Sequence, residues 1–263
     1  MIHVVSGQTS VEAWVKAANL LWESPKRVAY NVILDVCDPV TLTDRDFAIL
    51  QIMDAFLREH DAKPLNTVAG TIFPAGHYVR HGVEGVYERF PATYPKMEKG
   101  WGVYAMRILR RKGKNGEEIN PLKILVEKMR RQLAGKRMRA IYDLGTIDNE
   151  MLDIPIYAPS TDACQTRGRQ PCLSHLSFKI MPDDRLMLTV MYRYHYYVQK
   201  ALGNLIGLGQ LHKFVADQVG LSVGPLVCHS TYATLDNEGG WKVPELRALI
   251  DACNTAAQAS DAA

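Results

Sequence analysis

The residues with the clearest chemical potential are a cysteine and an arginine at matching ends of a predicted β-hairpin. Cys172 stands at the start of a run in which apolar and polar residues alternate over 176–180, the period-two pattern of a half-buried strand. A second alternating run, 186–193, follows the turn-like segment 181–184 and ends at Arg193. Antiparallel pairing would bring the two residues to the same end of a sheet. A thiolate is a nucleophile and a nearby guanidinium favours that charged form, so nucleophilic catalysis is one function of such a pair.

Two other interpretations of Cys172 follow from the residues alone. A single cysteine at a strand edge commonly serves as a small buried apolar side chain. A cysteine hydrolase would instead need a histidine partner, and His175 and His229 are the candidates. His175 lies three residues further along the strand, which predicts the opposite face, so His229 is the better partner for Cys172.

Composition places the chain among ordinary globular proteins. Its 263 residues are 47% hydrophobic and 22% charged, and no linker, repeat or apolar run of membrane-spanning length interrupts them, so one domain over 1–263 is predicted. The formal net charge of +3 is too small to indicate a nucleic-acid surface. Five scattered cysteines without a CxxC pair favour reduced thiols over disulfides or a metal site. The start lacks a secretory pattern, so a cytoplasmic location is expected.

The elements that must position the pair are predicted from periodicity and capping residues. Thr9, Thr43 and Asn120 are predicted N-caps. Segments 66–73 and 75–82 are less regular: the first fits a helix or a strand, and the second reads as a loop bordering a pocket, with Glu84 or Glu88 as a possible catalytic acid. Helices are expected at 10–22, 44–58, 121–134, 198–219 and 245–253, strands at 27–37, 138–144 and 223–235, and a disordered tail at about 256–263.

Three short motifs together resemble the thymidylate synthase family, whose members transfer a one-carbon unit to C5 of a pyrimidine nucleotide. They are Pro171-Cys172, Tyr192-Arg193 after two strands, and Leu202-Gly203-Asn204 at the start of a helix. The family has a Pro-Cys nucleophile, a Tyr-Gln-Arg-Ser phosphate-binding element and an asparagine in Leu-Gly-x-Pro-x-Asn, in this order. The resemblance covers about 100–232. It implies an α/β (α+β) fold with a large twisted mixed β-sheet flanked by helices, and a homodimer formed through the sheet face.

The resemblance also implies roles for the charged residues of the site. Cys172 would attack C6 of the base, and Arg193 would bind the phosphate of a pyrimidine nucleoside monophosphate next to the thiolate. Lys136 and Arg137 resemble paired arginines that reach the partner subunit's phosphate. The lysine keeps the charge of an arginine but lacks its bidentate fork.

Further residues would contact the nucleotide. Asn204 would face the base edge and Tyr232 the sugar, with Ser230 and His229 beside it. The stretch Gly102-Val103-Tyr104 resembles Gly-Pro-Val-Tyr-Gly of the family, which makes Tyr104 the candidate for proton handling near C5. An asparagine amide has donors and an acceptor, so Asn204 could pair with uracil or cytosine, and uracil is favoured.

Several positions depart from the family pattern. Tyr194 replaces a phosphate-binding serine, Tyr196 a folate-contacting aspartate and Ser230 a histidine, and segment 67–73 has no acid where a catalytic glutamate is expected. With 5,10-methylenetetrahydrofolate as the implied cofactor, these departures favour hydroxymethylation over dTMP synthesis. The alternatives are a non-catalytic nucleotide-binding homologue and the Cys/His hydrolase introduced above.

Overall fold

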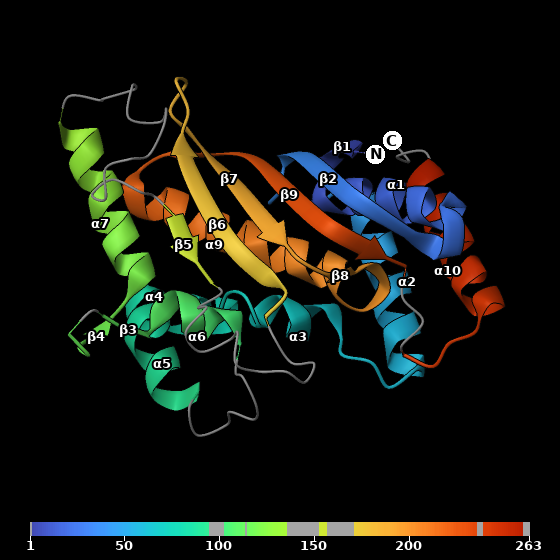
Figure 1. Cartoon of the computed structure of the whole chain (residues 1–263), viewed down its shortest axis with the longest axis horizontal. Helices are drawn as coiled ribbons and strands as arrows, with labels where there is room; N and C mark the ends of the chain where they lie inside the picture. The colour runs from blue at the N-terminus through green and yellow to red at the C-terminus, as the bar shows by residue number, and fades with distance from the viewer. Residues whose placement is uncertain are drawn as a thin grey trace.

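A twisted mixed β-sheet forms the centre of the protein (Figure 1). The structure, a computed structural model, describes residues 2–94, 103–113, 115–135, 153–156, 171–235 and 239–259. The sheet order is β1-β2-β9-β7-β6-β5, and the short β8 pairs with β9. Parallel and antiparallel pairs both occur, so the prediction of a mixed sheet flanked by helices is confirmed.

The strands come from both ends of the chain. β1 (His3–Thr9) runs parallel to β2 (Val28–Asp38), β2 antiparallel to β9 (Ser222–Thr234), and β9 parallel to β7 (Arg185–Tyr192). β7 and β6 (Leu173–Ile180) form the predicted antiparallel hairpin, and β5 (Asp153–Pro155) adds to β6. β8 spans His195–Tyr196, while β3 (Arg111–Lys112) and β4 (Glu118–Ile119) make a separate small sheet.

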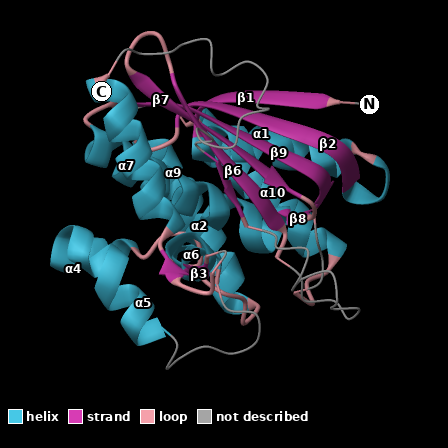
Figure 2. Cartoon of the chain, turned by 60° about the vertical axis from the view of Figure 1, so that its left-hand side comes forward, coloured by secondary structure: helices cyan, strands magenta, loops and turns pink. Residues whose placement is uncertain are grey.

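Helices cover one face of the sheet. α1, α9 and α10 lie behind the strands in Figure 1, and Figure 2 shows the same separation of strands and helices from the side. The helices are α1 (Ser10–Glu23), α2 (Asp44–Glu59), α3 (Leu65–Gly70), α4 (Ala75–Glu84), α5 (Phe90–Thr93), α6 (Tyr104–Leu109), α7 (Pro121–Ala134), α9 (Leu202–Val219) and α10 (Val243–Gln258), with shorter turns η1 (Pro25–Arg27), η2 (Gly85–Arg89) and η5 (Tyr197–Ala201). Within the described residues, none of the helices combines the length and apolar character needed to span a bilayer.

The three predicted N-caps are confirmed. The Thr9 hydroxyl accepts the backbone N–H of Glu12 at 3.1 Å, and the Asn120 amide oxygen accepts that of Lys123 at 3.0 Å. Thr43 forms a capping box with Asp46. Each cap satisfies a backbone donor that the first helical turn leaves without a partner.

Helix α9 is buried on nearly every side because its glycines allow α3 to approach closely. A Cβ at Gly203 would lie 2.7 Å from the Val68 Cβ, and one at Gly207 would lie 2.6 Å from the Ala69 carbonyl oxygen. These two glycines face a second helix, which fixes the position of α9 and of Asn204 near its start.

Several sequence predictions need correction. Segment 75–82, read as a loop, is part of helix α4, because its glycines and histidines hide the apolar period. The ambiguous segment 66–73 contributes to α3. Helix α10 continues to Gln258, so 256–258 is not a disordered tail. β1 was not predicted, and the strand expected at 138–144 lies outside the described residues.

Candidate functional site

The hairpin brings Cys172 and Arg193 together at one end of the sheet. Leu173 pairs with Tyr192. Cys172, just before Leu173, and Arg193, just after Tyr192, are therefore neighbours. The backbone N–H of Arg193 donates to the Cys172 carbonyl oxygen at 2.8 Å, and the guanidinium donates to the carbonyl oxygen of Pro171 at 2.6 Å. Both side chains are half-buried. The predicted juxtaposition of thiol and guanidinium is thus present in the structure.

Tyr104 holds the backbone of the cysteine from the other side. It is the first residue of α6 and only 8% exposed. Its hydroxyl oxygen accepts the N–H of Cys172 at 3.1 Å and that of Leu173 at 3.4 Å. Burial raises the pKa of Tyr104 to about 12, so the phenol keeps its proton at neutral pH. A protonated phenol therefore lies directly beside the cysteine.

Two opposing effects act on the thiol. Burial raises the pKa of Cys172, and the positive charge of Arg193 lowers it by a smaller amount, so the pKa stays above its usual value. The effect of the guanidinium has the predicted direction, but burial outweighs it and the thiol is mainly protonated. Burial alone raises the pKa of the Cys228 thiol to about 12. Cys37 differs from both cysteines in that its side chain is exposed.

Asn204 belongs to a buried chain of hydrogen bonds that the sequence did not reveal. The amide Nδ2 of Asn204 donates to Nε2 of His195 at 3.1 Å, and Nδ1 of His195 lies 2.9 Å from the Ser230 hydroxyl oxygen. The three residues are 4%, 1% and 0% exposed. Burial lowers the pKa of His195 to about 3, so the ring is neutral. Two predicted site residues, Asn204 and Ser230, are therefore joined by a histidine.

Tyr192 connects this chain to the cysteine. Its ring stacks on His195 with centroids 4.0 Å apart and planes 4° from parallel. Burial is the largest effect that raises the pKa of Tyr192. The ionised forms of Tyr104, Cys228 and Cys172 would raise this pKa further, so these three groups lie close enough to interact electrostatically with Tyr192. On the neighbouring strands, Tyr192 pairs with Leu173 and with Ser230. The thiol and the Tyr104 phenol therefore lie near one tyrosine, whose ring packs on the histidine that binds Asn204.

Tyr232 lies in a group of tyrosines at the end of β9. It stacks on Tyr194 with a centroid distance of 4.4 Å and meets Tyr30 edge-on at 5.3 Å. Tyr196 lies 4.7 Å from Tyr194. Tyr194 and Tyr196, which follow Arg193 closely in the sequence, therefore form an aromatic cluster with Tyr232.

His229 has its hydrogen-bond partner on β2. It pairs with Ile33 and Met191 on neighbouring strands, and its Nε2 lies 3.1 Å from Oδ1 of Asn31. Ser230, the next residue of β9, is buried on the opposite face. The hydrogen bond of His229 thus goes to an asparagine of β2 and not to Cys172, which argues against a hydrolase that pairs Cys172 with His229.

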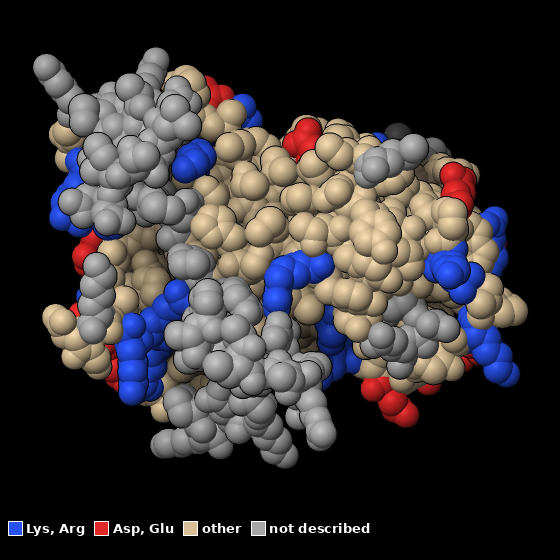
Figure 3. Space-filling view, in the orientation of Figure 1, with Lys and Arg blue, Asp and Glu red and all other residues tan. Residues whose placement is uncertain are grey.

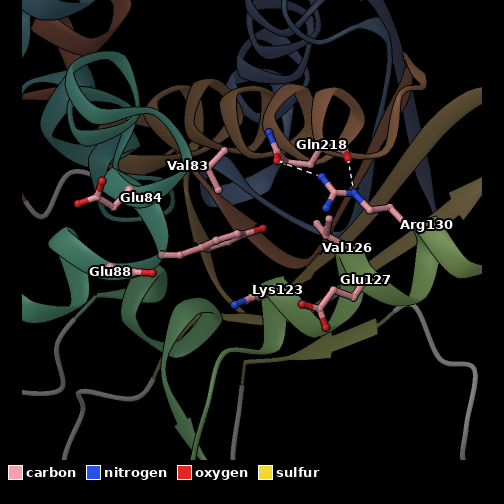
Figure 4. Close-up of a pocket in the computed structure, with 9 residues that line it drawn as sticks. Val83, Glu84, Glu88, Lys123, Val126, Glu127, Arg130 and Gln218 are labelled. Atoms are coloured by element: carbon pink, nitrogen blue, oxygen red, sulfur yellow. Dashed lines mark hydrogen bonds between the residues drawn. The ribbon is translucent and has the colours of Figure 1, made fainter.

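Glu84 and Glu88 line a separate pocket of about 300 Å³ (Figure 4). Its other walls come from α7 and the end of α9, where Arg130 donates to the Gln218 carbonyl oxygen at 2.7 Å. Asn204 and Gln218 are about 21 Å apart along α9, at a rise of about 1.5 Å per residue. The two glutamates are therefore poor substitutes for the missing acid at the cysteine.

Lys136 and Arg137, the residues predicted to bind the partner's phosphate, lie outside the described residues. Helix α7, which leads to them, ends at Ala134 as predicted. Among the residues that are described, no three His, Cys, Asp or Glu side chains gather closely enough to hold a metal ion.

Fold and site together define a class: a mixed α/β protein in which a cysteine at the end of a strand lies beside an arginine and a buried tyrosine. No protein-family model matches the chain. A protein of Methanococcoides burtonii named "Putative thymidylate synthase" is 26% identical over 143 residues, 54% of this chain and 56% of that protein. A protein of Methanosarcina mazei with the same name is 21% identical over 235 residues, 88% of each. The first match spans little more than half of its relative. Both matches support a divergent thymidylate synthase-like relationship.

Proposed function

We propose that this protein transfers a one-carbon unit to C5 of a pyrimidine nucleoside monophosphate, with Cys172 as the nucleophile at C6. One observation carries the proposal: Cys172 and Arg193 meet at the end of the hairpin, with Tyr104 on the backbone of the cysteine. The similarity to two proteins named as thymidylate synthases supports it. Arg193 would bind the phosphate, Asn204 the base and Tyr232 the sugar.

The chemistry requires a nucleophile, an anion-binding group and a proton donor close together. The Cys172 thiol first gives up its proton to solvent, and the thiolate sulfur then forms a bond to C6. The electron pair of the C5–C6 double bond moves to C5, where O4 shares the negative charge. C5 then takes up a proton or an electrophilic one-carbon unit. Loss of the original C5 proton and departure of the sulfur restore the double bond and the thiolate. Tyr104, protonated and next to the cysteine, is the residue proposed to move a proton at C5.

The fit of the implied cofactor, 5,10-methylenetetrahydrofolate, is incomplete. Tyr196 occupies the position of the folate-contacting aspartate and packs against Tyr194. Segment 67–73, where the family has a glutamate, contributes buried apolar side chains, Val68 and Ile72 among them. The described residues do not reproduce the acidic contacts that a folate has in this family, and we derive no step from that cofactor. These same departures favour a hydroxymethyl product over a methyl product.

We propose further that two copies of the chain pair through the sheet face opposite the helices. Cross-strand pairing aligns one row of residues on that face: Val4, Ile33, His229, Met191 and His175. Val4 is 64% exposed and Met191 38%, and the centre of this face carries few charges (Figure 3). A broad apolar surface of this kind is typical of an interface between identical subunits. The partner's Lys136 and Arg137 would then complete the phosphate site.

The test is release of tritium from C5-labelled dUMP, dCMP, UMP and CMP, with and without methylenetetrahydrofolate. We expect release by the wild type and none by Cys172→Ser. Cys37→Ser is the matched control, because Cys37 is exposed on β2, and it should behave as the wild type. Saturable nucleotide binding without release would instead identify a non-catalytic binding protein. No binding of any of the four nucleotides would refute the proposal.

A further inference from the structure

The orientation of the Asn204 amide is determined by its surroundings before any nucleotide binds. In the part of the chain that the structure describes, its hydrogen bond is the one to His195, in which Nδ2 faces Nε2 of the ring. Asn204 lies at the start of α9, whose position is fixed by the contact of Gly203 and Gly207 with α3. The side chain is therefore anchored at both its backbone and its amide nitrogen.

The state of the histidine follows from these contacts. A neutral imidazole carries one proton, so one ring nitrogen donates and the other accepts. Nε2 accepts from Asn204, which places the proton on Nδ1, where it is donated to the Ser230 hydroxyl oxygen. Turning the amide by half a rotation would set the Asn204 oxygen against the lone pair of Nε2. To relieve that, His195 would have to change tautomer and Ser230 would have to turn its hydroxyl, all without access to water.

The two pyrimidine bases need opposite orientations of this amide. Uracil presents a donor at N3 and an acceptor at O4, whereas cytosine presents an acceptor at N3 and a donor at N4. Asn204 still offers Oδ1 and the second proton of Nδ2. In one fixed orientation, this pair matches only one of the two bases held in the same pose.

We propose that His195, held by Ser230, is a positioning residue that fixes the Asn204 amide and so makes the site selective for one pyrimidine base. The inference rests on the proposed function, because it requires the base to lie against Asn204. One bidentate amide–base pair discriminates between bases by about 1–3 kcal/mol, which is roughly a factor of 5 to 150 in affinity. The wild type should therefore bind one member of each nucleotide pair about tenfold or more tightly than the other.

The experiment compares dissociation constants for dUMP against dCMP and for UMP against CMP, measured by calorimetry. In His195→Gln, the glutamine amide can donate or accept, so both orientations of Asn204 keep a partner. We expect the ratio of the two constants to fall to about threefold or less in this variant, with tight binding of the preferred nucleotide largely retained. The matched control is His212→Gln, since His212 is also fully buried, on α9, but donates to the Leu186 carbonyl oxygen at 2.6 Å. Its ratio should stay at the wild-type value.

A second measurement does not depend on the variant folding. Nitrogen-15 correlation spectra of the wild-type histidine rings distinguish the two tautomers, and His195 is expected with its proton on Nδ1. A proton on Nε2, or an unchanged base preference in a folded His195→Gln, would overturn the inference. If the wild type binds none of the four nucleotides, the proposed function fails, and the spectra still test the hydrogen-bond chain.

Discussion

Replacing Gly207 with alanine should destabilise the protein, although alanine is the better helix former. The new Cβ would lie 2.6 Å from the carbonyl oxygen and 3.0 Å from the Cα of Ala69, and 3.1 Å from the Cβ of Ile72. The first two atoms belong to the backbone of α3, so no side chain can rotate to make room. Overpacking costs about 1–3 kcal/mol, and we expect the upper part of that range because two of the close atoms belong to the backbone. The gain in helix propensity is about 1 kcal/mol. The expected net loss is about 1–2 kcal/mol of unfolding free energy.

The assay is urea unfolding followed by circular dichroism, with the free energies of the variants compared at a common slope. Gly70→Ala is the matched control, because Gly70 ends the partner helix α3 and no atom lies within 4 Å of the Cβ position. That variant should be neutral or slightly more stable than the wild type. Nucleotide affinity should fall in Gly207→Ala only, since α9 carries Asn204. If Gly207→Ala proves as stable as Gly70→Ala, the described contact between α9 and α3 is wrong.

Three further predictions concern the site. In the wild type, the positive charge of Arg193 lowers the pKa of Cys172, so Arg193→Gln should raise this pKa. The rate of iodoacetamide alkylation should then increase at a higher pH than in the wild type. Tyr104→Phe removes the acceptor of two backbone N–H groups, which should cost about 1–3 kcal/mol of unfolding free energy, and should slow C5 exchange about a hundredfold or more. Mixing inactive Cys172→Ser with inactive Arg137→Ala subunits should restore about a quarter of the wild-type activity if each site uses both subunits.

Each of these predictions has a matched control. Arg185→Gln removes an exposed arginine at the start of β7 and should leave the alkylation profile of Cys172 in place. Tyr87→Phe removes a hydroxyl without a hydrogen-bond partner in the described chain, so its loss should cost little. Two preparations that both carry Cys172→Ser should stay inactive after mixing. An unmoved profile, a fully active Tyr104→Phe or mixing without recovery would each contradict the corresponding role.

Local patterns in the sequence predicted much of the framework. Alternation over 176–180 and 186–193 predicted the hairpin. It was enough to place Cys172 beside Arg193, since antiparallel register is a local consequence of a short turn. Thr9, Thr43 and Asn120 predicted helix starts because a cap depends on residues only three positions away. These features need no information about distant parts of the chain.

The rest depends on contacts between distant segments. Strand β1 pairs with β2 across α1, and its sequence alternates too weakly to indicate a strand by itself. The partner of Gly207 is Ala69, 138 positions earlier, and no period in α9 reveals it. His195 was missed for a similar reason: only the position of α9 over β9 places it between Asn204 and Ser230. His195 lies two residues after Arg193 in the sequence, and this short separation was the available signal that it lies near the site.

The nucleophilic role of Cys172 is tested most directly by mass spectrometry of the protein after incubation with a 5-nitro pyrimidine nucleoside monophosphate. The nitro group stabilises the negative charge at C5, so addition of the thiolate to C6 should give a persistent adduct. We predict one nucleotide attached to the peptide that contains Cys172, and none in Cys172→Ser. An adduct at the exposed Cys37 alone, or no adduct although the nucleotide binds, would contradict the proposed role of Cys172.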